Sequence, residues 1–124
     1  MLLNKQRLSG STDGRAIKVT TTSSPGTTVH TAQSGTTLSD LYDEIWLWGW
    51  NTDGTARLVT VQWGGTTAPD DSITRTLNAQ GSASGDGLVL LVPGLILQNG
   101  DIVKVFAALT NVVMIVGYVN KISP

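Results

Sequence analysis

The chain of 124 residues has no cysteine, a single histidine and only 14% charged residues. Without cysteine there is no disulfide, no thiolate metal ligand and no thiol nucleophile. Typical soluble domains carry about 25% charged residues, so the low charge indicates a surface that neighbouring molecules cover. The longest apolar run, Val112 to Val119, is far shorter than the ~20 residues of a membrane-spanning helix, and no membrane partner is expected.

Positive charge is also scarce, and it is unevenly distributed. The net charge is −1, which predicts no global basic field for nucleic acid. Residues 1–18 are nevertheless basic, with Asp13 as their one acidic residue and four basic side chains: Lys5, Arg7, Arg15 and Lys18. Because Lys5 and Arg7 interrupt the apolar start of the chain, no signal peptide is expected. The basic segment is either a solvated tail or a contact for an acidic partner surface.

What the chain has in abundance is threonine, serine and glycine, which make up a third of it. Short alternating runs separated by turn signals predict about eight strands between residues 15 and 122. We therefore expect an all-β fold, a single antiparallel β-sandwich over residues 15–124. Residues 1–14 show no periodicity and are predicted to form an extended N-terminal arm, whose deletion should leave the fold intact.

Two pairs of runs are predicted to form hairpins. Residues 43–50 and 55–63 are separated by a four-residue turn sequence, and residues 102–109 and 112–122 by Thr110–Asn111. In residues 43–50, tryptophan alternates with Ile45, Leu47 and Gly49. Because both faces of this strand are apolar, the pattern predicts that both are covered.

Four tryptophans are the main candidates for function: Trp46, Trp48, Trp50 and Trp63. The first interpretation is that they fill the core. The second is that they form an interface, because large rigid rings are enriched where proteins bind each other. The third is a platform for carbohydrate, which requires coplanar, solvent-exposed rings.

The residues that usually carry catalysis or metal binding form no constellation. His30 lies in a short strand pattern with no second histidine, and is predicted to be a packed or surface strand residue. The adjacent carboxylates of residues 43–44 and 70–71 are interpreted as ordinary strand and loop charges, although calcium at 70–71 is conceivable. We expect no catalytic residue, no cofactor, no metal and no small-molecule substrate.

Several stretches resemble a family of small bacteriophage virion proteins. They are residues 11–19, 26–32 and 43–47, the segment Trp63-Gly-Gly-Thr-Thr-Ala-Pro-Asp70, the segment Val92-Pro-Gly-Leu-Ile-Leu-Gln-Asn-Gly100, and residues 117–122. The resemblance implies a jelly-roll-like β-sandwich and a non-enzymatic structural role, namely a decoration (cement) protein on the capsid exterior.

The expected partners are then the major capsid protein and further copies of this chain, as a homotrimer or dimer. The protein would be made in the bacterial host cytoplasm. A tail or head–tail joining component and a carbohydrate-binding or adhesin module remain as alternatives.

Overall fold

The computed structural model describes residues 1–35 and 41–124 as an all-β protein, with nine strands and no helix in these two ranges. In chain order the strands are β1 (Leu2–Arg7), β2 (Ile17–Lys18), β3 (Thr27–Thr31), β4 (Tyr42–Asn51), β5 (Arg57–Trp63), β6 (Ser72–Leu77), β7 (Val89–Gln98), β8 (Ile102–Ala107) and β9 (Val113–Ser123).

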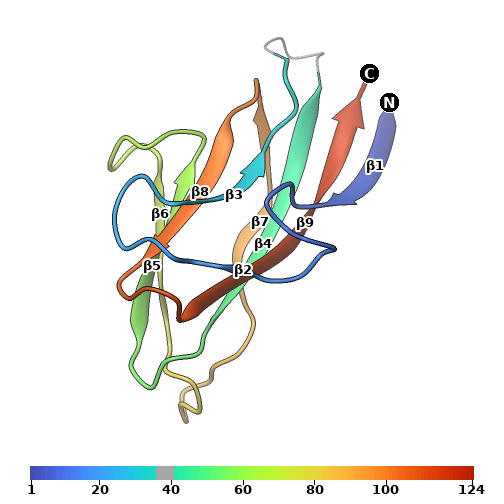
Figure 1. Cartoon of the computed structure of the whole chain (residues 1–124). Helices are drawn as coiled ribbons and strands as arrows, with labels where there is room; N and C mark the ends of the chain where they lie inside the picture. The colour runs from blue at the N-terminus through green and yellow to red at the C-terminus, as the bar shows by residue number, and fades with distance from the viewer. Residues whose placement is uncertain (36–40) are drawn as a thin grey trace.

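The strands form two antiparallel sheets that pack face to face (Figure 1). The five-stranded sheet has the order β1-β9-β4-β7, and the short β2 also pairs with β9. The four-stranded sheet has the order β3-β8-β5-β6. The prediction of a β-sandwich is confirmed.

Both predicted hairpins at the tryptophan strand and at the C-terminus are wrong. β4 pairs with β7 and β9, whereas β5 pairs with β6 and β8 in the other sheet. The connection from β8 to β9 likewise passes from one sheet to the other. A short turn sequence predicts that the chain reverses direction, but it does not decide whether the two flanking strands pair with each other. A connection of the same length can also cross from one packed sheet to the other.

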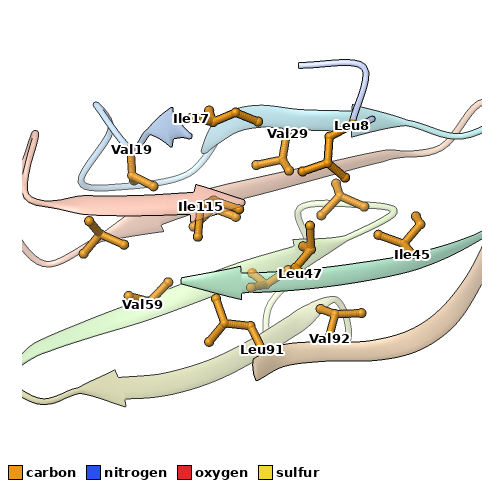
Figure 2. Packing of buried hydrophobic residues seen from close by; sticks show 14 of the residues in the cluster. Leu8, Ile17, Val19, Val29, Ile45, Leu47, Val59, Leu91, Val92 and Ile115 are labelled. Atoms are coloured by element: carbon orange, nitrogen blue, oxygen red, sulfur yellow. The ribbon is translucent and has the colours of Figure 1, made fainter. Parts of the chain in front are cut away.

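The core lies between the sheets and consists mainly of valine, leucine and isoleucine (Figure 2). Val59, Val103 and Val105 from the four-stranded sheet meet Ile45 and Leu47 from the five-stranded sheet, and all five are at most 1% exposed. Branched side chains at every second position fill the space between two pleated faces, which is the usual core of a sandwich.

Residues 2–10 belong to the sandwich, in contrast to the separate arm expected from the sequence for residues 1–14. β1 pairs with β9 along all six of its residues. Leu8 is 1% exposed and lies in the core, and the Gly10 amide donates to the Val29 carbonyl. A strand at a sheet edge with both faces exposed needs no alternation of apolar and polar residues. The sequence of residues 2–7 therefore gave no strand signal.

The outer faces of the two sheets differ in what covers them. On the four-stranded sheet, Gln62 is 2% exposed although its neighbour Val61 points into the core. The Gly26 amide donates to Gln62 Oε1 at 2.8 Å, and Gln62 Nε2 donates to Ser24 Oγ at 2.9 Å. The loop between β2 and β3 therefore lies over the Gln62 end of this face, whereas Leu58 on the same face is 48% exposed.

Candidate functional site

The tryptophans of β4 lie on the outer face of the five-stranded sheet. Burial alternates strictly along β4: Ile45 and Leu47 are buried, while Trp46, Trp48 and Trp50 are partly exposed. The prediction that both faces of this strand are covered is therefore wrong, and so is the interpretation of these three rings as core. The second layer of the sandwich packs on one face only, and the sequence did not show which.

Three aromatic rings on this face form a compact cluster, which we call the aromatic platform: Trp46, Trp48 and Tyr118. Tyr118 lies on β9, directly opposite Trp46 in the β4–β9 ladder. Ring centroids are 6.0 to 6.2 Å apart in all three pairs, and the interplanar angles are 16° to 28°. The near-parallel rings support each other, which lowers the cost of keeping them in one conformation for a partner.

Polar contacts hold the platform at one end. Trp46 Nε1 donates to Glu44 Oε1 at 2.8 Å, and Asn120 Nδ2 donates to the same oxygen at 2.9 Å. These two hydrogen bonds, that from Trp46 first, lower the pKa of Glu44 below its ordinary value, and partial desolvation opposes them. Glu44 is therefore a carboxylate at neutral pH and fixes the indole of Trp46.

A cation and further apolar side chains extend the platform across the sheet. Lys5 Nζ on β1 lies 4.2 Å from the centroid of the Tyr118 ring, a cation–π contact. On β7, Leu90 pairs with Trp48 and Ile96 with Glu44, and their side chains are 42% and 56% exposed. The result is an exposed apolar face with a charged rim, the composition found where proteins bind partners.

The fourth tryptophan is not part of this cluster. Trp63 ends β5 in the four-stranded sheet, where it shares the face of Val59 and Val61 and packs against the core. The grouping of all four tryptophans in one site is therefore wrong. Trp50 is on the platform side of β4, opposite Met114 of β9, and continues the apolar face beyond Trp48.

The four basic residues of the N-terminal segment are all exposed, but they lie in two places. Lys5 and Arg7 on β1 line an open surface groove together with Lys121, Asp13 and other residues. Arg15 and Lys18 line a different, shallow depression next to β2. The segment therefore presents two small basic sites, and the one at β1 adjoins the platform through Lys5 and Tyr118.

His30 is part of a buried polar network. A register shift in β3 between Thr28 and His30 places both Val29 and His30 inward. His30 Nε2 lies 2.5 Å from Asp43 Oδ2, and the Ser9 amide donates to His30 Nδ1 at 2.9 Å. Nδ1 is therefore the acceptor and Nε2 carries the proton. Gln33 Nε2 donates to Asp43 Oδ1 at 2.8 Å, so both carboxylate oxygens have partners.

This network is structural in its geometry, as the interpretation of His30 as a packed strand residue predicts. Although serine, histidine and aspartate lie together, it is the Ser9 backbone that contacts His30, and the Ser9 hydroxyl accepts from the Thr31 amide at 2.8 Å. A nucleophilic serine would instead place its hydroxyl on the histidine ring. The network ties the Ser9 segment to β3 and β4.

Within residues 1–35 and 41–124, no group of three or more His, Asp or Glu side chains is arranged to hold a metal ion. At residues 70–71, the Asp71 carboxylate accepts from the Thr67 amide and so closes its own loop. No helix long and apolar enough to span a membrane occurs in those ranges.

Comparisons with known proteins do not assign this chain to a family. Neither protein-family models nor the searches of curated proteins and of solved structures gave a match.

Sequence reasoning missed three residues of the site: Tyr118, Glu44 and Gly94. Tyr118 comes from a strand far from β4 in sequence, and only the β4–β9 pairing brings the two together. A signal for Glu44 was present, since it stands two residues before Trp46 and thus on the same face of a strand. Gly94 of β7 leaves room for the Trp46 ring, which a Cβ at this position would meet at 2.7 Å. It gave no signal in the sequence, because this contact joins two different strands.

Proposed function

We propose that this chain is a non-enzymatic structural protein of a bacteriophage virion, a decoration protein that binds the major capsid protein on the shell exterior. The observation that carries the proposal is the aromatic platform, whose three stacked rings are partly exposed on the outer face of the five-stranded sheet. The resemblance of the sequence to small virion proteins supplies the class of particle. Both point to a protein whose work is attachment.

The chemistry of the platform suits a protein partner. Trp and Tyr are the residues that most often dominate the energy of an interface, because large rings bury much apolar area and lose little side-chain entropy. Glu44 and Lys5 on the rim add charges that fix orientation. Binding to the assembled shell and not to free subunits would stabilise the shell by mass action.

The test uses shells of the encoding phage assembled without this protein. We expect the purified chain to co-sediment with expanded shells and to raise their rupture temperature in calorimetry. The double variant Trp46→Ala/Trp48→Ala should weaken binding by about a hundredfold, the range of an interface hot spot. Leu58→Ala is the matched control, because Leu58 is a large apolar residue, 48% exposed, on the other sheet.

The outcomes separate the alternatives for the particle. If neither the wild-type chain nor the variants bind shells, the decoration role is wrong. Electron microscopy of labelled virions then tests the tail or head–tail joining role, for which the label would lie at one vertex and its attached tail. Label over the whole shell would support decoration.

A carbohydrate-binding module is a second candidate, and one observation favours it. The three rings have nearly parallel planes and are partly exposed, and aromatic rings that bind sugars stack on the apolar faces of pyranose rings. Titration of the chain with neutral and acidic oligosaccharides, followed by tryptophan fluorescence, tests this candidate. Saturable quenching that Trp48→Ala abolishes would support it, and unchanged fluorescence across the glycans would exclude it.

A further inference from the structure

The five-stranded sheet ends in an unusually open edge strand. β1 lies at the edge of its sheet (Figure 1) and pairs with β9 on one side only. All six of its residues are exposed. Every second residue of an edge strand directs its N–H and C=O groups away from the sheet. Because the side chains of β1 are exposed along its whole length, its outer edge is accessible to a further strand.

The other three edges offer less. β7 contains Pro93, which has no N–H to donate, and its pairing with β4 shifts register twice. β3 is a five-residue strand with a register shift. β6 is regular, but its inner side packs on the core through Ile73 and Leu77. β1 is the regular, uninterrupted edge with both faces free.

The charge on and beside β1 defines what kind of strand would fit. Lys5 and Arg7 are two positions apart and therefore project from the same face. Lys121 of β9 lines the same groove, in which Asp13 is the one acidic residue. A second copy of β1 in this position would bring like charges together, whereas glutamate or aspartate at alternate positions would face Lys5 and Arg7.

We propose that β1 is a strand-addition site for an extended segment of a partner protein that carries acidic side chains at alternate positions. Main-chain hydrogen bonds to β1 would supply affinity, and the pairing with Lys5 and Arg7 would supply specificity. The inference rests on the proposed function in one respect, that the occupant is a protein. Only β1 would separate the added strand from Tyr118 on β9, whose ring Lys5 contacts.

The alternative reading of these charges is protective. Natural proteins place lysine and other charges on exposed edges to prevent pairing with other chains. The two readings differ in what they predict for an acidic strand: a protective edge rejects every strand, whereas a recognition edge accepts one of opposite charge.

The experiment uses the full chain and a capped octapeptide of alternating glutamate and valine. We expect NMR titration to give saturable shifts at β1 amides, and hydrogen exchange to show new protection at alternate residues of β1. Binding should weaken with added salt, since the charges are exposed. A peptide of alternating lysine and valine should bind at least about tenfold more weakly, by the same electrostatic argument.

Two changes test the contacts separately. The variant Lys5→Glu/Arg7→Glu should weaken binding of the acidic peptide by about tenfold or more. Arg75→Glu, a charge reversal on the exposed edge strand β6, should leave it unchanged. If the double variant frays β1, N-methylation of alternate peptide amides tests the same hydrogen bonds against the unaltered protein and should abolish protection.

Three results would overturn the inference. They are absence of binding by the acidic peptide, equal binding of the acidic and basic peptides, and protection of the β1 amides by self-association without peptide. Failure of the proposed function is distinguishable, because shell binding and its loss in the platform variant are measured independently of the peptide. A chain that binds shells but no acidic strand refutes the edge site alone.

Discussion

The indole of Trp46 lies directly against Gly94 of the neighbouring strand. A Cβ on residue 94 would fall 2.7 Å from Cζ2 and 2.8 Å from Cε2 of that ring, closer than non-bonded atoms approach. Gly94 also has a φ of +74°, in the left-handed region that disfavours other residues. The aromatic platform therefore depends on a glycine that lies in β7, far from Trp46 in sequence.

The first prediction concerns this contact. Gly94→Ala should displace the Trp46 ring and lower the free energy of unfolding by about 1–3 kcal/mol, because strain and steric overlap act together. Urea denaturation and the near-ultraviolet circular dichroism of the tryptophans measure the two effects. Gly54→Ala is the control, since a Cβ there meets nothing within 4 Å. Equal stability of the two variants would contradict the role given to Gly94.

The second prediction concerns the N-terminal segment. Leu8→Ala should reduce the free energy of unfolding by about 2–5 kcal/mol, because it leaves a cavity in the core. Leu3→Ala removes the same atoms from a side chain that is 58% exposed, and should change it by less than about 0.5 kcal/mol. Thermal or urea unfolding of both variants provides the measurement.

Deletion of residues 1–14 should accordingly destabilise the fold, and a stable truncated chain would show that Leu8 is dispensable.

The third prediction concerns the buried network of His30 and Asp43. Asp43→Ala leaves the His30 Nε2 proton and the Gln33 amide without their acceptors and should cost about 1–3 kcal/mol, the range for a buried donor left without a partner. Asp43→Asn should cost less, because the amide oxygen can still accept from His30 Nε2. Chemical denaturation at neutral pH measures both losses. If the two variants lose equal stability, the hydrogen bond to His30 is not what the aspartate contributes.

The fourth prediction concerns pH and Glu44. Its pKa in the folded protein lies below the ordinary 4.5, chiefly because Trp46 Nε1 donates to the carboxylate. The ionised group therefore contributes stability that is fully present above pH 4.5 and is lost as pH falls through the lowered folded value. Glu44→Gln has no such titration, so the stability difference between wild type and variant should shrink in acid.

The measurement for Glu44 is urea denaturation at a series of pH values between about 7 and 3. The NMR signal of the Trp46 indole N–H should shift with the same midpoint in the wild type and stay constant in Glu44→Gln. A pH-independent stability difference would mean that the hydrogen bond to Trp46 does not favour the charged form.

Much of the local structure follows from the sequence alone. The alternation of residues 43–50 predicts a strand there, and it divides the side chains of β4 between the two faces correctly. Alternation succeeds because successive side chains of a strand point to opposite sides whatever the strand pairs with. It fails at residues 2–7, where both faces of β1 are exposed and no apolar period exists.

Only part of the aromatic platform and its surroundings could be predicted from the sequence. Trp46, Trp48 and Trp50 on one face could be read from their spacing, but both faces of the strand are apolar, so spacing could not decide which one is covered. Tyr118 and Gly94 could not be assigned at all, because they reach Trp46 through strand pairing across long sequence separations. The basic residues were identified, yet their division into two places depended on where β1 and β2 attach to β9.

The sequence by itself determined that this chain forms short strands with a Val-, Leu- and Ile-rich inner face, and that it has no thiol and a single histidine. Those properties are local, since they depend on residue type and on a period of two. Tertiary structure decided the rest: which sheet each strand joins, which face of β4 stays exposed, and that Leu8 is core. The physical reason is that burial is a property of two surfaces, and the second surface is supplied by residues distant in the chain.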